Sequence, residues 1–396
     1  SMVKKQASKQ SKGETTAARG RPITRRKFLG AAGVAAAGAA AASNLTIFSR
    51  QAKAADRLRV LTWTGYEEKV VIEEFEDTHG VKVDFKTYVG EEQMLQFFNQ
   101  SPPGTYDTIV LSPEYVRKLN AIDALEPFDP KHIPELANFH PSFRKIHHVQ
   151  AEGGKIWGIA TRFSFYGLSY NTNEMSFEES QDWNSLFLPK FKKRVGIFDW
   201  YLPNMGNASL AVHPNKENPY DLTDDQLQNV RAWLMKLRPQ VNSIPPSTGA
   251  IVQQMVNGDV TVAMVGDLDI NLKLAGFDNF KSTIPKQGGI LWTEVAVLCK
   301  QSTNKELALE WITYMSQPHV QAKLVFTKLF KARAPNLKVV EHWTKEQSQL
   351  MGYYPDPNNP GQMLVETNLA KSAVRDLPVQ QPEKKWIDIF NAFKTG

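Results

Sequence analysis

The first half of the chain alternates short apolar runs with stretches of helical spacing. Residues 58–62, 81–85 and 106–111 have the composition of strands. Residues 67–78 and 91–99 between them place apolar side chains three and four positions apart, as an amphipathic helix does. Repeated strand–helix–strand units of this length predict an α/β fold in which each sheet is mostly parallel and flanked by helices.

The same pattern continues to the end of the chain. We expect strands at 166–170, 195–198 and 260–265, and helices at 224–237, 246–257, 304–316 and 318–329. The 342 residues that follow position 54 are more than one hydrophobic core usually serves, so two lobes are expected. Neither an internal repeat nor a long linker interrupts them. We therefore expect the chain to cross between the lobes as strands.

The first 54 residues have the order of an export signal. A basic stretch leads to Arg25-Arg26, which precedes Phe28-Leu29 and an Ala/Gly run over residues 30–42. Ala52-Lys53-Ala54 then offers the A-x-A pattern that a signal peptidase accepts. An Arg-Arg pair before Phe-Leu is typical of a twin-arginine signal, so we expect export through the twin-arginine translocase to the periplasm.

A transmembrane anchor is the alternative for this segment. The Ala/Gly run is only weakly apolar and is interrupted by Ser43-Asn44, whereas a span needs about 20 apolar residues. Ser1-Met2 is interpreted as a remnant of cloning, and the mature chain is expected to begin at or near Ala55.

The basic balance of the chain comes from its first 54 residues. The formal charge is +6, with 47 basic and 41 acidic side chains. Removing the eleven basic residues and the one acid of residues 1–54 leaves 36 and 40, so the body is mildly acidic. A nucleic-acid-binding protein is expected to carry its basic patch on the folded domain, so the composition disfavours that class.

Motifs of enzymes and metal sites are scarce. GxGxxG, P-loop, HExxH and G-x-S-x-G patterns do not occur. The one cysteine, Cys299, lies in an apolar run and is expected to be a buried apolar side chain. His147-His148 has no cysteine or acid nearby in sequence to complete a metal site. Tyr353-Tyr354 lies in a proline-rich loop, where a ferric iron site is a weak alternative. No cofactor is expected.

Aromatic residues beside acids or small polar residues follow several strands. In open parallel sheets, ligands bind just past the carboxyl ends of strands. A ring face attracts an ammonium by about 0.5–2 kcal/mol, and a carboxylate adds a charge-assisted hydrogen bond. These positions therefore predict a cleft that traps a small organic amine. The candidates are Trp63, Thr64, Tyr66, Ser112, Glu114, Asp199, Trp200, Asp267, Trp292 and Glu294.

Each candidate also has a purely structural interpretation. Trp63 and Tyr66 could simply cover a hydrophobic core, and Trp200 could be a packing residue without contact to a ligand. Glu114 could begin a helix, where the helix dipole favours an acid, and Asp267 could be a helix N-cap. Trp292 and Glu294 are two apart in a strand-like run and so share one face. Packing alone does not explain an inward-facing acid beside a tryptophan.

These stretches resemble the periplasmic spermidine/putrescine-binding proteins of ABC importers over nearly the whole mature chain. The matching segments are 61–66, 106–112, 257–260, 285–292 and 334–336. The resemblance implies that Trp292 and Glu294 hold the amine, that Trp63, Thr64 and Tyr66 line the cleft, and that Ser112 and Ser247 contact the ligand. It also implies a two-lobed fold that closes on its ligand, docks as a monomer on an inner-membrane ABC permease, and catalyses no reaction.

Departures from the family pattern leave the ligand open. The family often has an aromatic residue where this chain has Glu114, and a tryptophan where it has Gly266. The region around Asp199 does not match the family's segment that holds the acids for the second ammonium of the ligand. Arg162 lies just before the expected crossover strand, where a guanidinium would repel a polyamine but could bind a carboxylate. If Arg162 faces the cleft, a zwitterion such as 4-aminobutyrate becomes a candidate ligand. The alternative is that Arg162 forms a structural salt bridge.

The expected architecture places residues 56–165 and 290–340 in lobe one, and residues 166–289 and 341–396 in lobe two. Crossings are expected near 164–167, 285–291 and 337–343. Besides a polyamine, the alternatives are another amino acid or an aminophosphonate in the same cleft, a sensing role without transport, and a twin-arginine-exported enzyme.

Overall fold

A computed structural model describes residues 57–328 and 330–396. The expected export signal, residues 1–54, lies outside the described residues. The described residues form one compact unit. In the described part of this unit, no helix is both long enough and apolar enough to cross a bilayer.

The first sheet is built on the β-α-β pattern expected near the beginning of the mature chain. Strand β1 pairs in parallel with β2 on one side and β3 on the other. Strand β11 then pairs antiparallel with β3 and with β5, and its first residues pair in parallel with β12. The strands of this sheet are β1 (Arg57–Thr62), β2 (Lys82–Thr87), β3 (Thr108–Leu111), β4 (Leu125–Glu126), β5 (Gly158–Tyr166), β11 (Gly289–Cys299) and β12 (Ser372–Val374).

The second sheet has five strands in the order β10-β6-β9-β7-β8. Strand β7 is parallel to β8 and β9, whereas β6 is antiparallel to β9 and β10. Both sheets are therefore mixed, rather than mostly parallel as the pattern predicted. The strands are β6 (Leu168–Asn171), β7 (Val195–Gly196), β8 (Val241–Ser243), β9 (Val262–Ala263) and β10 (Phe280–Thr283).

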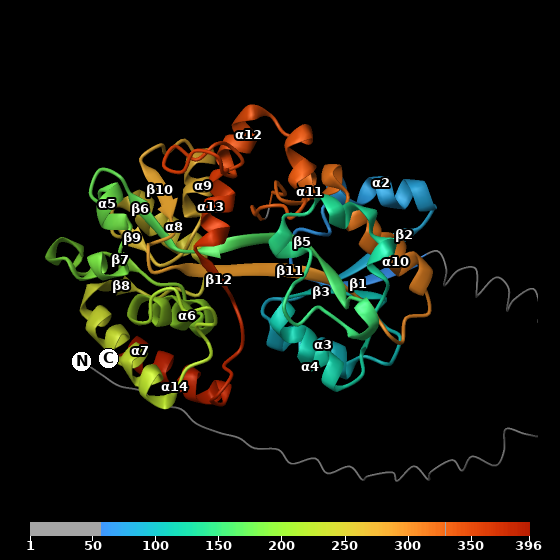
Figure 1. Cartoon of the computed structure of the whole chain (residues 1–396), viewed down its shortest axis with the longest axis horizontal. Helices are drawn as coiled ribbons and strands as arrows, with labels where there is room; N and C mark the ends of the chain where they lie inside the picture. The colour runs from blue at the N-terminus through green and yellow to red at the C-terminus, as the bar shows by residue number, and fades with distance from the viewer. Residues whose placement is uncertain (1–56, 329) are drawn as a thin grey trace, which may run out of the picture. The chain divides into compact units, whose positions relative to one another are not determined.

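Strands β5 and β11 connect the two lobes. They pair over most of their length and run side by side across the middle of the view in Figure 1. Only Gly167 separates the end of β5 from β6, and β10 leads to β11 through residues 284–288. The cleft thus has a two-stranded floor shared by both lobes, and residues of β5 and β11 can face it.

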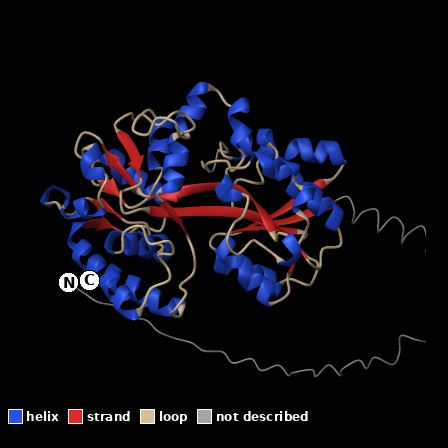
Figure 2. Cartoon of the chain, viewed as in Figure 1, coloured by secondary structure: helices blue, strands red, loops and turns tan. Residues whose placement is uncertain are grey.

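Helices cover both sheets (Figure 2). The α-helices are α2 (Lys69–His79), α3 (Glu91–Gln100), α4 (Pro113–Ala121), α5 (Phe177–Ser180), α6 (Tyr201–Val212), α7 (Asp224–Leu237), α8 (Thr248–Asn257), α9 (Leu268–Leu274), α10 (Lys305–Met315), α11 (Pro318–Leu324), α12 (Lys345–Leu350), α13 (Leu364–Ala370) and α14 (Glu383–Thr395). The 3-10 helices are η1 (Pro130–His132), η2 (Pro134–Asn138), η3 (Pro141–Phe143), η4 (Glu152–Gly154), η5 (Trp183–Phe187), η6 (Pro189–Phe191), η7 (Arg238–Gln240) and η8 (Leu337–His342).

Aromatic contacts mark the two cores. In the first lobe, Phe75 of α2 meets Trp311 of α10 edge-on, with ring centroids 5.0 Å apart. In the second, Tyr220 stacks on Trp386 of α14 at 5.8 Å. Both tryptophans are fully buried. Each such ring buries a large apolar area and so helps to fix its lobe and the walls of the cleft.

The end of the chain runs through η8 and β12. Residues 337–342 form η8, which packs against α11, and the crossing expected near 337–343 stays a prediction. Strand β12 later pairs with the start of β11. Helix α14 then packs on α6 and α7. Arg375 and Asp376 directly follow β12 and so lie beside both lobes.

Candidate ligand-binding cleft

A cavity of about 470 Å³ lies between the two lobes. This is within the range of about 300–1,000 Å³ that small-molecule sites occupy. Its wall combines aromatic rings with charged groups of both signs. The residues that line it are Trp63, Thr64, Val89, Gly90, Ser112, Arg162, Ser164, Phe165, Tyr166, Phe198, Asp199, Trp200, Pro246, Thr248, Val265, Gly266, Asp267, Leu268, Asn271, Trp292, Glu294, Phe330, Lys331 and Arg375.

Strand ends position much of this wall. Trp63 follows β1 directly, and Ser112 follows β3. Since β1 and β3 are parallel neighbours, their carboxyl ends meet at one edge of the sheet. Asp199 follows the turn after β7, and Gly266 and Asp267 lie just beyond β9, which is parallel to β7. The alternation of β-strands thus brings distant segments to one cleft, as the sequence predicted.

Arg162 and Glu294 form an ion pair across the two connecting strands. They are direct partners in the β5–β11 register. The guanidinium donates from Nε to Oε2 at 2.6 Å and from Nη2 to Oε1 at 3.2 Å. Both side chains are buried, at 1% and 7% exposed. Tyr66 donates to the same carboxylate at 2.7 Å, and burial, reinforced by Glu294, raises the pKa of this tyrosine well above its usual value.

Arg375 forms a second buried ion pair with Glu114. Its Nε donates to Oε1 of Glu114 at 2.7 Å, and its Nη2 donates to Oγ of Ser112 at 2.6 Å. The guanidinium carbon lies 4.6 Å from the ring centroid of Trp200. Burial alone would lower the pKa of Arg375, but Glu114 more than offsets this, so the pKa is raised and the guanidinium stays charged.

Arg333 and Asp267 form a third pair. Nη1 of Arg333 lies 2.7 Å from Oδ2 of Asp267 and donates to Oγ of Ser164 at 2.7 Å. Ser164 in turn donates to the same carboxylate oxygen. The guanidinium of Arg333 also lies 5.2 Å from the ring centroid of Phe165. Each of the three arginines is therefore ion-paired and also rests against an aromatic ring.

Asp199 is the remaining acid of the cavity wall. It accepts a hydrogen bond from Nζ of Lys394, the last lysine of α14, at 2.9 Å. Both side chains of this pair are about one-third exposed (31% each), so solvent screens the attraction. All three lining acids, Asp199, Asp267 and Glu294, therefore have a basic partner.

Trp292 lies on the same face of β11 as Glu294, as their spacing predicted. Both residues line the cavity. Trp292 is partly buried, and its ring meets that of Phe330 edge-on with centroids 5.7 Å apart. Among the described residues, no guanidinium covers the face of Trp292, in contrast to those of Trp200 and Phe330. This leaves an aromatic surface on the cavity wall for a ligand.

Nine of the twelve residues proposed from the sequence line the cavity. These are Trp63, Thr64, Ser112, Arg162, Asp199, Trp200, Asp267, Trp292 and Glu294. The sequence left open whether Arg162 faces the cleft or forms a structural salt bridge. The structure places it in the cavity wall and also in a salt bridge with Glu294.

The other three residues do not line the cavity. Tyr66 is 0% exposed and lies behind Glu294, because its hydroxyl is held by that carboxylate. Glu114 is 1% exposed and is turned toward Arg375. Ser247 is the N-cap of α8 and accepts a hydrogen bond from the amide of Ala250 at 3.3 Å, although its neighbours Pro246 and Thr248 do reach the wall.

Sequence reasoning missed most of the basic residues near the cavity. Arg333 directly precedes the Ala334-Pro335-Asn336 motif, so its position was within reach of the family resemblance. Arg375 follows the short strand β12, which the pattern did not reveal because it has only three residues. Phe330 and Lys331 lie beyond α11, which ends at Leu324 rather than at the expected residue 329.

Gly266 has no room for the tryptophan that the family commonly has at this position. A Cβ at this position would lie 2.2 Å from the carbonyl oxygen of Phe165 and 3.0 Å from the amide nitrogen of Gly167. The chain after β9 thus packs directly against the backbone of the crossing segment. An aromatic residue here would require this backbone to move, so the cleft of this chain differs from the family pattern at its floor.

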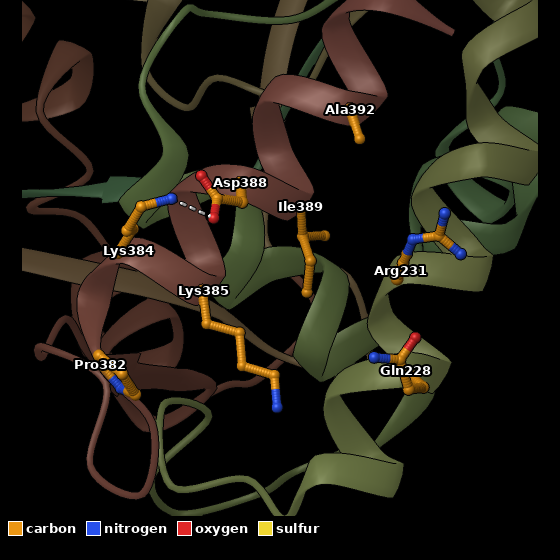
Figure 3. Close-up of a pocket in the computed structure, with 8 residues that line it drawn as sticks. All are labelled: Gln228, Arg231, Pro382, Lys384, Lys385, Asp388, Ile389 and Ala392. Carbon is orange, nitrogen blue, oxygen red and sulfur yellow. Dashed lines mark hydrogen bonds and ion pairs between the residues drawn. The ribbon is translucent and has the colours of Figure 1, made fainter.

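Another hollow, of about 440 Å³, lies between α7 and α14 (Figure 3). Its residues include Arg231, Lys384 and Lys385, and the ammonium of Lys384 is paired with Asp388 at 2.6 Å. It contains none of the residues that the sequence singled out. The cavity between the lobes is therefore the better candidate for the ligand site.

The two tentative metal motifs have different surroundings. An acid distant in sequence does join the histidines: Asp376 accepts from Nε2 of His148 at 3.0 Å, and His147 lies close by. By contrast, Tyr353 is buried, and its hydroxyl donates to the carbonyl oxygen of Ala334 at 2.6 Å. That hydrogen bond occupies the Tyr353 hydroxyl within the protein interior, which weakens the iron hypothesis.

The fold and the cavity together define a class of protein. Two α/β lobes joined by crossing strands, with a ligand-sized cavity between them, form a binding protein that can close on a small solute. The chain belongs to the bacterial extracellular solute-binding protein family, whose model matches residues 71–351.

Similar proteins agree with this assignment. The chain is 25% identical over 315 residues to spermidine/putrescine-binding periplasmic protein 1 of Haemophilus influenzae, covering 77% of this chain and 82% of that protein. It is 20% identical over 296 residues to the putrescine-binding periplasmic protein PotF of Escherichia coli, covering 70% and 79%. A putative spermidine/putrescine ABC transporter structure from Listeria monocytogenes has a TM-score of 0.68 at 23% identity, covering 86% and 99%.

Proposed function

We propose that this protein captures a small organic amine in the periplasm and delivers it to the membrane permease of an ABC importer. The observation that carries the proposal is the cavity itself. Aromatic rings and carboxylates from both lobes line one space of about 470 Å³. The names of the similar proteins, which bind spermidine and putrescine, support an amine as ligand.

The same proposal includes the mechanism of capture. Lobe one would hold residues 56–165 and 290–340, and lobe two residues 166–289 and 341–396. A ligand that touches Trp292 on one side and Asp199 or Trp200 on the other gains contacts from both lobes only when they are closed. Binding therefore favours the closed form, because only that form has the added affinity. The permease would recognise this closed form, with the binding protein acting as a monomer.

We further propose that the protein binds its ligand without transforming it. Support comes from the lining acids, which are held in ion pairs with Arg162, Arg333 and Lys394. A carboxylate held in this way is a poor general base. The proposal also includes export by the twin-arginine route and cleavage near Ala55, supported by the order of motifs in residues 1–54.

A thermal-shift experiment on the full chain tests the capture of an amine. The panel contains putrescine, cadaverine, spermidine, agmatine, short amino acids and choline, with glucose and succinate as ligands without nitrogen. A ligand at 100 times its dissociation constant adds about 2.7 kcal/mol of stability, which raises the melting temperature by a few degrees. The proposal requires a shift with at least one amine, and is wrong if only the ligands without nitrogen, or none, produce one.

Two matched tryptophan variants locate the binding. Trp292→Ala removes a partly buried ring from the cavity wall, and the shift is expected to disappear or to need at least tenfold more ligand. Trp343→Ala removes a partly buried ring that packs on Phe326 and Tyr353, away from the cavity, and should preserve the shift. Equal losses in both variants would argue against this cavity as the ligand site.

A further inference from the structure

The charges around the cavity are unsuited to a ligand that carries only positive charge. The lining acids Asp199, Asp267 and Glu294 each have a basic partner. Glu114, just behind the wall, forms an ion pair with Arg375. Among the described residues, the wall and these direct partners contain five basic groups and four acidic ones: Arg162, Lys331, Arg333, Arg375 and Lys394 against Glu114, Asp199, Asp267 and Glu294.

Lys331 is the basic group without an acidic partner. Within residues 57–328 and 330–396, no carboxylate lies within ion-pair distance of its ammonium, which donates instead to the backbone carbonyl of Thr327. Burial lowers the pKa of Lys331, and the more distant Glu68 only opposes this. Keeping this ammonium charged at the cavity wall therefore costs free energy that a carboxylate of the ligand would recover.

Arg162 adds positive charge beside Lys331. Its guanidinium carbon lies 4.3 Å from the ring centroid of Phe330, the residue before Lys331. Nη1 of Arg162 is buried and has no hydrogen-bond partner in the described part of the chain. A Cβ placed on Gly65 would come within 3.0 Å of this nitrogen and 3.1 Å of Oγ1 of Thr327, so the two side chains approach one point. We call Arg162, Thr327, Phe330 and Lys331 the basic corner.

Two lining acids have capacity for a positively charged group. Only one oxygen of Asp199, Oδ1, is engaged by Lys394, and only Oδ2 of Asp267 is engaged by Arg333 and Ser164. The second oxygen of each carboxylate has no partner among the described side chains. Both residues line the cavity. One ammonium can be accepted there, whereas a second ammonium would have to face the basic corner.

We propose that the ligand is a zwitterion, with a cationic nitrogen at one end, received by Asp199 and Asp267, and a carboxylate at the other, received by Lys331 in the field of Arg162. This inference rests on the proposed capture of a small amine in the same cavity and names its chemical class. A zwitterion adds no net charge to the site. A diamine of equal length adds two positive charges to a wall that already has a positive excess, and like charges repel.

Pairs of ligands that differ only at one end test the inference. The full chain is titrated calorimetrically with glycine, β-alanine, 4-aminobutyrate, 5-aminovalerate and 6-aminohexanoate. Each is compared with the diamine that has the same number of carbon atoms, in which an aminomethyl group, CH2–NH3+, replaces the carboxylate. Agmatine is likewise compared with 4-guanidinobutyrate. The best amino-acid ligand should bind at least tenfold more tightly than its matched diamine.

A lysine variant assigns the carboxylate to the basic corner. Lys331→Gln should weaken the best amino-acid ligand by about 10- to 100-fold, because a charge-assisted contact is lost, while the matched diamine binds equally or more tightly. Lys273→Gln is the control, since Lys273 is paired with Asp278 on the exposed surface of α9. It should change neither affinity by more than about twofold.

The outcomes separate this inference from the proposed function. If a diamine binds more tightly than its matched amino acid, the zwitterion inference is wrong and the capture of an amine stands. If Lys331→Gln weakens both members of a pair equally, the carboxylate is not received at the basic corner and the inference is again wrong. If neither member of any pair binds, and no amine of the thermal-shift panel raises the melting temperature, the zwitterion inference and the proposed capture of an amine are both wrong.

Discussion

Arg375 reaches across 261 positions of sequence to hold Glu114 at 2.7 Å, and so ties the segment after β12 to the first turn of α4. The same guanidinium supports Ser112 and Trp200, which line the cavity. Both partners of the ion pair are almost fully buried, at 4% and 2% exposed. The pair thus neutralises an acid that the sequence suggested would face the ligand, and it holds the Arg375 guanidinium in the cavity wall.

Removing Glu114 should destabilise the protein strongly. Glu114→Ala leaves the Arg375 guanidinium buried without its acid, which typically costs about 3–5 kcal/mol. Urea unfolding followed by tryptophan fluorescence measures the loss. Glu92→Ala is the control, since this acid is largely exposed and its contact with Lys118 is 3.5 Å long; its cost should stay below about 1 kcal/mol.

A double variant separates the buried charge from the packing. Glu114→Leu combined with Arg375→Met removes both charges and keeps most of the volume, so it should be more stable than Glu114→Ala. If the single variant unfolds at the same urea concentration as Glu92→Ala, the ion pair does not have the structural importance that its burial indicates.

Periodicity alone predicted much of the fold, because many elements have one buried face. Helix α7 was expected at 224–237 and occupies Asp224–Leu237, with a capping box between Thr223 and Gln226. Strand β11 was expected from Trp292 and Glu294, whose alternation places both in the wall. In these elements, local sequence and burial favour the same structure, so a pattern search succeeds.

Elements that are buried on all sides were missed. Helix α6 buries residues 202–211 without interruption, so it has no polar face to reveal its period. Strand β5 contains Arg162 among buried residues and has no alternation either. Helix α14 is a different case. Trp386, Ile389, Phe390 and Phe393 follow helical spacing, and the sequence analysis overlooked this signal.

The paired state of the acids could not be predicted from sequence. Glu294 and Arg162 are 132 positions apart and meet only because β5 and β11 pair in register. Asp267 and Arg333 meet because residue 333 bridges to β5. The sequence identified most of the lining residues, but their ionic partners depend on tertiary contacts. The proposal of a zwitterion in place of a polycation rests on these partners.

Gly65→Ala should disturb the basic corner. Gly65 has φ = 107°, which side-chain-bearing residues rarely adopt, and a new Cβ would lie 3.0 Å from Nη1 of Arg162. We expect a loss of about 1–3 kcal/mol in stability and weaker binding of any ligand that approaches Arg162. Gly249→Ala, in the first turn of α8 with open space around it, is the control and should be neutral or slightly stabilising. Equal effects of the two variants would contradict the crowding at Gly65.

Gly266→Ala should separate the cleft floor from the loop after β9. Its Cβ would lie 2.2 Å from a backbone oxygen, and a backbone atom cannot move as a side-chain end can. Such overpacking typically costs about 1–3 kcal/mol. Thermal unfolding measures the cost, and ligand titration should show weaker binding because Asp267 is displaced with its neighbour. A variant as stable as the parent would show that the loop adapts, and an aromatic residue would then be tolerable there.

Glu91 should make the stability fall as the pH rises through the weakly acidic range. Burial, opposed by hydrogen bonds from Ser112, raises the pKa of Glu91 from 4.5 to about 7 in the folded state. Between these values the folded protein keeps a proton that the unfolded chain has released, so the free energy of unfolding decreases with increasing pH. At about 1.4 kcal/mol per pKa unit, the decrease is on the order of 3 kcal/mol.

Glu91→Gln removes this titration and can keep the two contacts of Oε1, although its amide nitrogen cannot accept from the Tyr88 hydroxyl that Oε2 receives. Oε1 of Glu91 accepts from the amide of Ser112 at 2.8 Å and from Nε1 of Trp63 at 3.4 Å, and the glutamine oxygen can accept both. Urea unfolding from pH 4.5 to 7.5 should show a shallower slope in this variant than in the parent. Glu92→Gln, the exposed neighbour, should preserve the parental slope. Parallel slopes in the parent and Glu91→Gln would show that Glu91 loses its proton in the folded state at an ordinary pH, so that the buried site behind Trp63 is better solvated than its contacts indicate.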